Sequence, residues 1–204
     1  MVNRKALLIV ASALVTALIL SSLAVTRTAR SEGETPANPD IIMFLQVNGI
    51  PGESTEDLHM NWIDIDAFAW SEAMASLGSA VSGRSAGKLN MTAFHFAMTT
   101  NKASVMLFLA CATGRIIPQA TFDVCKPATE AGLVVFLQFE FVGVTIASYS
   151  IAGSTPLDRP IDEFSIAFSK ITMTYWQIMS DGALGPKVTA YYDLIAGRGG
   201  IIPP

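Results

Sequence analysis

The sequence predicts a mainly β domain with one helix, and three observations support that fold class. Short apolar runs recur with a period of two, and turns rich in glycine, proline and aspartate separate them. Residues 101–114 break that period and repeat their apolar side chains at helical spacing instead. The 204 residues are enough for one domain and contain no internal repeat. These features favour a β sandwich or barrel that carries a single helix.

The first 26 residues have the character of an export signal. Two basic residues precede an uncharged run from Ala6 to Thr26, which is long enough to span a bilayer as a helix. The tripeptide Ser22–Ala24 offers the small residues that suit signal cleavage. We therefore expect residues 1–26 to be a signal peptide or, where they are retained, a membrane anchor. A buried core helix is the alternative interpretation of this run.

The remaining chain divides into three parts by composition. Residues 27–40 are a polar linker with two prolines. The folded domain is expected over residues 41–197, and residues 198–204 form an apolar C-terminal tail. With the signal in front, this domain is expected outside the cell or at its surface. If residues 6–26 are retained, they would insert into a membrane, which would then be a partner of the chain.

Six runs have strand character. They are residues 41–47, 62–70, 88–98, 136–144, 162–176 and 187–195. In the third run Asn90, Thr92, Phe94, Phe96 and Met98 share one face. The fifth run moves its large apolar residues to the opposite face after Lys170. Such a change suits a strand that bends from one packing layer into another.

One helix is expected between the third and fourth runs. Its apolar stripe consists of Ala103, Met106, Leu107, Ala110 and Cys111. Thr100 or Asn101 is positioned to cap its start, and Gly114 is positioned to end it. The opposite flank of the helix is apolar too, which is typical of a helix buried on both sides. A barrel covers one side only, so we expect a neighbouring subunit to cover the other.

Composition excludes some functions and favours self-association. Charged residues make up 15% of the chain against a typical value of about 25%, and the formal net charge is -4. Nucleic acid is therefore not an expected partner, because it requires a basic surface. Two cysteines and two histidines are too few for a structural zinc site. Cys111 and Cys125 are interpreted as buried thiols, with a disulfide between them as the alternative.

The sequence offers no convincing catalytic site. The segment SGRSAGKL at residues 82–89 approaches the phosphate loop of nucleotide hydrolases, but its spacing is short, and a strand follows where a helix is needed. Asp64 and Asp66 are interpreted as solvated charges. His59 and His95 are interpreted as hydrogen-bonded structural residues, because no nucleophile with an orienting group can be assigned to either. We expect no enzyme activity, cofactor or metal.

Five segments resemble one known family in order and spacing. They read VNGIPGESTEDLH, WIDIDAFAWSEAM, GRSAGKLNMTAFHF, NKASVMLFLACATGRIIPQATF and DGALGPKVTAYYD. On these motifs, which extend from about Met43 to Ala196, the chain resembles the Hcp family, the haemolysin-coregulated proteins of type VI secretion systems. The resemblance implies an Hcp-like β-barrel of two sheets with one flanking helix. It also implies hexameric rings that stack into a hollow tube, without a catalytic site.

The resemblance matches three segments to parts of the family fold. It matches residues 102–114 to the family helix, residues 52–62 to a long loop that reaches a neighbouring ring, and Gly83, Gly87 and Lys88 to a glycine-rich turn. The implied assembly surfaces comprise Gly52, Glu53, Ser54, His59, Trp62, Lys102, Val105, Phe108 and Leu109.

Together these observations predict an exported structural protein that self-associates. The expected assembly is a stack of hexameric rings that forms a secreted or cell-surface tube. A type VI secretion tube subunit or an exported effector of the same family is the first alternative. A monomeric secreted binding domain is the second.

Overall fold

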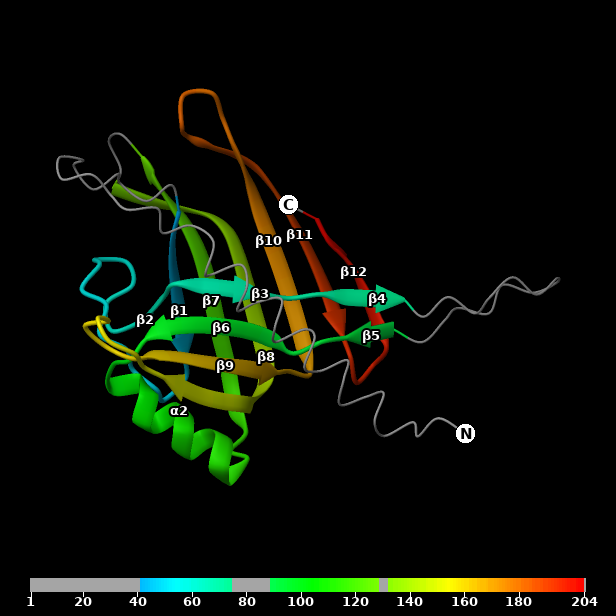
Figure 1. The fold of residues 1–204 in the computed structure, drawn as a ribbon. Helices are drawn as coiled ribbons and strands as arrows, with labels where there is room; N and C mark the ends of the chain where they lie inside the picture. The colour runs from blue at the N-terminus through cyan, green and yellow to red at the C-terminus, as the bar shows by residue number, and fades with distance from the viewer. Residues whose placement is uncertain (1–40, 75–88, 129–131, 204) are drawn as a thin grey trace, which may run out of the picture. The chain divides into compact units, whose positions relative to one another are not determined.

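The computed structural model describes residues 41–74, 89–128 and 132–203 (Figure 1). The expected signal or anchor at 1–26, the linker at 27–40 and the turn at Gly83, Gly87 and Lys88 lie outside these residues. Within the described ranges, no helix has the length and apolar character needed to cross a membrane.

The domain consists of two antiparallel sheets that share one long strand. The larger sheet runs in the order β12-β11-β10-β8-β7-β1-β2, and the smaller runs β3-β6-β9-β8. A separate ribbon pairs β4 with β5. The bounds are β1 (Ile42–Val47), β2 (Ile63–Ile65), β3 (Ala67–Ala69), β4 (Glu72–Met74), β5 (Leu89–Met91), β6 (Phe94–Thr99), β7 (Ile117–Ala128), β8 (Gly132–Ala152), β9 (Ile161–Ala167), β10 (Lys170–Ile178), β11 (Leu184–Asp193) and β12 (Arg198–Ile202). The prediction of a mainly β fold with two sheets is confirmed.

Strand β8 belongs to both sheets because it changes direction near its middle. Its first half pairs with β7 and β10, and from Thr145 onward it pairs with β9. Gly143, just before this change, has a φ of 63°, a conformation that side chains other than glycine rarely adopt. The sequence showed only residues 136–144 of this strand. The pairing with β9 shifts register between Ile146 and Ser148, so the last part of β8 does not continue the same alternation.

The two sheets enclose a core rich in phenylalanine. Its aromatic cluster comprises Phe94, Phe96, Phe122, Phe139, Phe141 and Phe164, all buried. The Phe94 ring centroid lies 4.9 Å from that of Phe96 and 5.2 Å from that of Phe141, so the two sheets contact each other through these rings. Met98 is also buried, so Phe94, Phe96 and Met98 share one face as predicted. The run 88–98 is not one strand, however, because it divides into β5 and β6.

Two strand runs divide between the sheets. The run 162–176 forms β9 and β10, which lie in different sheets, as its change of face predicted. The run 62–70 was predicted as one strand, but it forms β2 in the larger sheet and β3 in the smaller. The predicted tail also differs, because residues 198–202 form β12 and pair with β11. The glycine-rich sequence of these residues shows no strand pattern, and pairing with β11 holds them in an extended conformation.

Helix α2 (Lys102–Thr113) lies against β8 on the outside of the barrel (Figure 1). The Asn101 side chain accepts a hydrogen bond from the Ala103 amide at 2.9 Å, and Gly114 ends the helix in a left-handed conformation. The predicted caps are thus confirmed. Ala103, Ser104, Leu107 and Ala110 face the barrel. The outer flank faces solvent in the single chain.

Candidate functional site

The loop between β1 and β2, residues 48–62, folds back against the barrel and against itself. The amide of Gly52 donates to the carbonyl of Asn61 at 2.8 Å, and the amide of Ser54 donates to the carbonyl of Trp62 at 3.0 Å. Asn61 has a φ of 62°, which allows the chain to turn back. A Cβ at Gly52 would lie 2.1 Å from the carbonyl oxygen of Trp62. Glycine is therefore required where the two arms of the loop meet.

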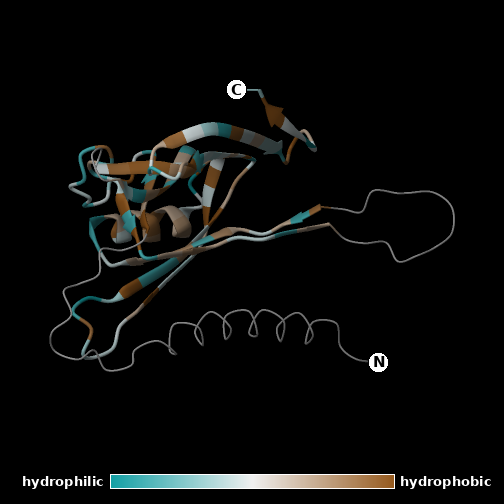
Figure 2. Cartoon of the chain, turned by 90° about the horizontal axis from the view of Figure 1, so that it is seen from above, coloured by the Kyte–Doolittle hydropathy of each residue, from teal (hydrophilic) through white to brown (hydrophobic). Residues whose placement is uncertain are grey.

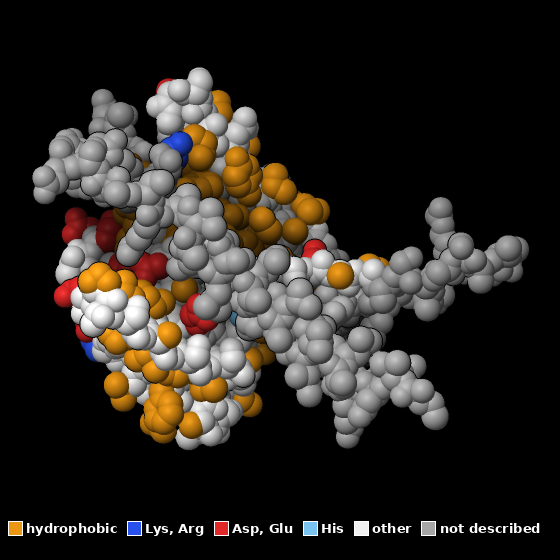
Figure 3. Space-filling view, in the orientation of Figure 1, with side chains coloured by type: hydrophobic (Ala, Val, Ile, Leu, Met, Phe, Trp, Pro, Cys, Tyr) orange, Lys and Arg blue, Asp and Glu red, His pale blue; other side chains and the backbone are white. Residues whose placement is uncertain are grey.

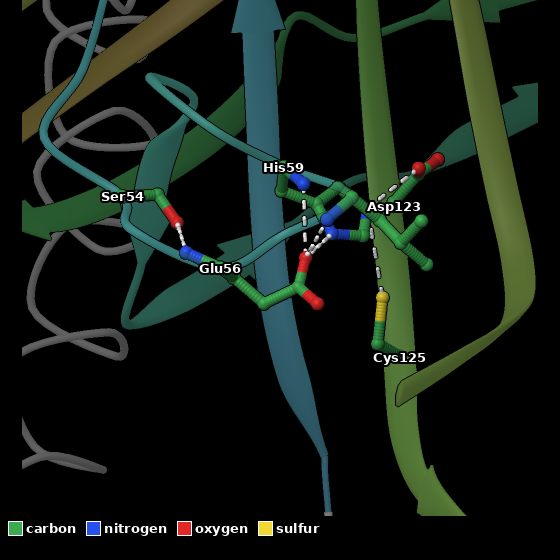
Figure 4. Close-up of polar contacts among 6 residues, drawn as sticks. Ser54, Glu56, His59, Asp123 and Cys125 are labelled. Atoms are coloured by element: carbon green, nitrogen blue, oxygen red, sulfur yellow. Dashed lines mark hydrogen bonds and ion pairs between the residues drawn. The ribbon is translucent and has the colours of Figure 1, made fainter. Parts of the chain in front are cut away.

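His59 fixes this loop to the larger sheet (Figure 4). Its ring, only 2% exposed, stacks on Phe44 of β1 with the centroids 4.2 Å apart. Its Nδ1 lies 2.6 Å from Oε2 of Glu56 in the same loop. Its Nε2 lies 3.1 Å from Oδ2 of Asp123 on β7. The prediction of a hydrogen-bonded structural histidine is confirmed for His59.

The charge of His59 follows from these contacts. Carboxylates only accept hydrogen bonds, so both ring nitrogens must donate, and only the imidazolium form carries two protons. Burial alone lowers the pKa of His59, but hydrogen bonds to Asp123, Cys125 and Glu56 outweigh it and raise the pKa to about 10. The ring is therefore a buried cation at neutral pH.

The same cluster contains a thiol, but it is closed to substrates. Sγ of Cys125 lies 3.9 Å from Nε2 of His59, and the Cys125 side chain is fully buried. A thiol, an imidazole and a carboxylate are the parts of a cysteine nucleophile, yet no substrate reaches this sulfur. Both cysteines are free thiols, so the interpretation as buried thiols holds for Cys125, while Cys111 is half-buried. Across the described ranges, no group of three or more His, Cys, Asp and Glu side chains is arranged so that it could hold a metal ion.

The loop also contacts the start of α2. Oε1 of Glu53 accepts a hydrogen bond from the amide of Lys102 at 2.9 Å. The Lys102 ammonium donates to Oδ1 of Asn61 at 3.4 Å. A carboxylate is favourable at a helix N-terminus, where backbone amides lack partners. The structure therefore brings together Glu53 and Lys102, two predicted surface residues that are 49 positions apart.

The other acidic and histidine candidates lie apart from this cluster. Burial raises the pKa of Asp64, with contributions from Asp66 and Glu53, although a hydrogen bond to Ser54 opposes the rise. Asp66 accepts a hydrogen bond from Thr99 at 3.0 Å. His95 lies on the outer side of β6 and is exposed. These residues form no shared site with His59.

Two apolar surfaces face solvent in the single chain. The first is the outer flank of α2, where Val105 is 71% and Leu109 is 58% exposed, together with Phe108. These exposed apolar side chains agree with the sequence pattern, which predicted a helix that is apolar on every side. Figure 3 shows hydrophobic side chains gathered over α2 and again over β10 to β12.

The second surface continues the core face of the larger sheet beyond the barrel. Met173 pairs with the buried Phe139 on one side and with Ala190 on the other, and Ala190 pairs with Ile201. Residues that pair across neighbouring strands share one face of a sheet. The row that runs from Phe139 through Met173 and Ala190 to Ile201 therefore begins in the core and ends in solvent. Figure 2 shows the apolar end of β12 beside the C-terminus. The open sheet face comprises Met173, Tyr175, Val188 and Ile201.

Sequence reasoning missed the open sheet face, although one signal was present. The large apolar residues after Lys170 alternate through Met173 and Tyr175, and the last strands repeat that alternation at Val188. Nothing in the alternation indicates that the smaller sheet ends before covering them.

The family match decides the relationship of this chain to known proteins. Residues 44–175 match the family model described as "Type VI secretion system effector, Hcp". The chain belongs to the Hcp family. The matched residues include most of β1, the β1–β2 loop, α2 and most of β10.

Individual Hcp proteins are similar to this chain in sequence and structure. Protein hcp1 of Pseudomonas aeruginosa is 28% identical over 141 residues, which cover 69% of this chain and 86% of that protein. A solved structure titled "Structure of a type six secretion system protein" superimposes with a TM-score of 0.73 at 26% identity, covering 78% of this chain and 99% of that one. Hcp1 from Salmonella typhimurium superimposes with a TM-score of 0.65 at 29% identity, covering 79% and 99%.

Proposed function

We propose that this Hcp protein is a non-enzymatic subunit that assembles into hexameric rings, which stack into a tube. The observation that carries the proposal is the pair of exposed apolar surfaces, the outer flank of α2 and the open sheet face. The two surfaces differ in residues and in secondary structure, so a contact between unlike surfaces of two copies is the natural use for them. Head-to-tail contacts of this kind close into rings when the rotation between subunits allows it.

The low charge of these surfaces supports the same proposal. The outer flank of α2 and the open sheet face contain no charged residue, and the core of a protein interface is depleted of charge in the same way. A monomer would expose these side chains to water without compensation. The alternative of a monomeric binding domain gives them no role.

We expect Leu109→Asp to prevent ring formation, because it buries an unpaired charge at the contact while leaving the barrel intact. Ring formation should weaken at least about tenfold, which corresponds to about 1.4 kcal/mol per interface. Negative-stain microscopy and sedimentation measure rings, and thermal melting checks the fold. Ser154→Asp, in the exposed loop after β8, adds the same charge as a control. Wild-type protein that stays monomeric at every concentration contradicts the proposal.

Export by the N-terminal segment is part of the proposal, and a role within a type VI apparatus is the second candidate. The uncharged run from Ala6 to Thr26 supports the first route, and the family match favours the second. N-terminal sequencing of the extracellular protein separates the routes. A chain that begins near Val25 indicates signal cleavage, and an intact Met1 in the membrane fraction indicates an anchor. An intact Met1 outside the cell, lost when the sheath gene is deleted, indicates type VI secretion.

A further inference from the structure

We propose that His59 is a positioning residue whose protonated ring latches the β1–β2 loop to strand β7, and that loss of its proton releases the loop. The two hydrogen bonds of the ring join different parts of the chain, since Glu56 belongs to the loop and Asp123 to the sheet. One imidazolium therefore connects the loop to the barrel.

Each carboxylate is itself held in place, so the latch has defined ends. Oε2 of Glu56 also accepts hydrogen bonds from the amides of Leu58 and His59, both at 2.9 Å. The other oxygen of Asp123 accepts a hydrogen bond from Gln138 of β8 at 2.9 Å. The turn of the loop is thus organised around the Glu56 carboxylate, and the neighbouring part of the sheet around the Asp123 carboxylate. The His59 ring lies between these two groups and sets the distance between the loop and the sheet.

A neutral ring cannot maintain this arrangement. It carries one proton and can donate to one carboxylate only, which leaves the other facing an unprotonated nitrogen. If the neutral ring donates to Glu56, the buried Asp123 keeps only the hydrogen bond from Gln138. Its charge is then left without a neighbouring cation, which is strongly unfavourable. Release of the loop lets water reach this carboxylate.

The surroundings of the ring account for its charge. The titratable groups that face it are Glu56 from the loop and Asp123 and Cys125 from β7. The groups packed on it from β1 and the loop are the neutral rings of Phe44 and Trp62. Carboxylates on both sides of a buried ring favour its protonated form.

The latch gives the loop a fixed surface before any partner arrives. Leu58 and Met60 project from the loop and are exposed, while His59 between them is buried. The family resemblance implied that His59 lies on an assembly surface. We infer instead that His59 acts from beneath, by holding its two apolar neighbours in place.

The pH range of the latch follows from the pKa of His59. The pKa is about 10 in the folded protein and 6.5 in an unfolded chain. Because the folded-state pKa is raised, the stability that the protonated ring contributes is fully present below pH 6.5 and is lost as the pH rises through about 10, where the ring loses its proton and the latch opens. The loop is therefore held throughout the neutral range.

Two measurements on the wild-type chain test the latch. Nitrogen-15 NMR of the histidine ring should show both nitrogens of His59 protonated at pH 7, with titration near pH 10. Subtilisin should cut the loop at residues 52–62 at least about tenfold faster above pH 10 than at pH 7, relative to an unstructured peptide of the same sequence. A singly protonated ring at pH 7, or a loop equally resistant at both pH values, overturns the proposal.

A pair of histidine variants sharpens the test. His59→Gln has no charge, and both N–H donors of its amide lie on one nitrogen, so it cannot bridge two carboxylates as the imidazolium does. Its loop should be cut rapidly at pH 7 and show little further change at pH 10. His95→Gln, which alters the exposed histidine of β6, should behave as wild type. Protection of the His59→Gln loop equal to that of wild type would show that the charge is unnecessary. The protonation state of the ring, read by NMR, does not depend on ring formation.

Discussion

Replacement of His59 by alanine is expected to lower the free energy of unfolding by about 3–5 kcal/mol. The change removes one of the two side-chain donors of the buried Asp123 and the ring partner of Glu56, so two carboxylates lose their shared cation. It also removes the ring that stacks on Phe44 at 4.2 Å, which leaves a cavity beneath the loop. Loss of charge pairing and loss of packing act in the same direction.

Urea denaturation of His59→Ala and wild type, monitored by tryptophan fluorescence, measures this effect at pH 7. His95→Ala is the matched control, because it removes the other histidine of the chain from an exposed position. We expect the control to change stability by less than about 0.5 kcal/mol. Equal effects of the two substitutions would contradict the assignment of His59 as a buried cation.

The second large effect is expected for Gly52→Ala. A Cβ at this position would lie 2.1 Å from the carbonyl oxygen of Trp62 and 2.5 Å from Cα of Ile63. Both atoms belong to the backbone at the start of β2, so no side-chain rotation relieves the contact. We expect a loss of about 3 kcal/mol, the upper part of the range for overpacking, together with separation of the two arms of the loop.

Thermal and urea melts of Gly52→Ala measure this loss. Gly200→Ala on β12 is the control, because a Cβ there meets its nearest neighbour, the Tyr191 ring, at an ordinary contact distance of 3.7 Å. Cleavage by subtilisin at pH 7 should increase for Gly52→Ala alone. Stability equal to that of Gly200→Ala would mean that the two loop arms do not meet as described.

Local sequence signals predicted the elements whose causes are local. The α2 caps depend on Asn101 and Gly114, which lie next to the helix they bound. The inner face of β6 follows from alternation within one run, at Phe94, Phe96 and Met98. The sequence also identified the apolar outer flank of α2, because periodicity alone shows where each helical residue faces.

The remaining features depend on residues that are distant in the chain. The charge of His59 requires Asp123, which lies 64 positions away, so sequence could indicate a structural histidine but not a buried cation. The position of β12 requires β11, because its glycines carry no strand pattern. The split of run 62–70 depends on where β1 and β6 lie, and the alternation continues through Asp66 without showing it.

Strand β8 also determines how the barrel responds to mechanical load. Its 21 residues are hydrogen-bonded to β7 and β10 in one sheet and to β9 in the other. A force that pulls the two sheets apart therefore acts along a continuous covalent chain and on both sets of hydrogen bonds together. Even if the hydrogen bonds between β8 and β9 break, the covalent chain of β8 still joins the two sheets. We therefore expect a load applied to one sheet to reach the other through this strand.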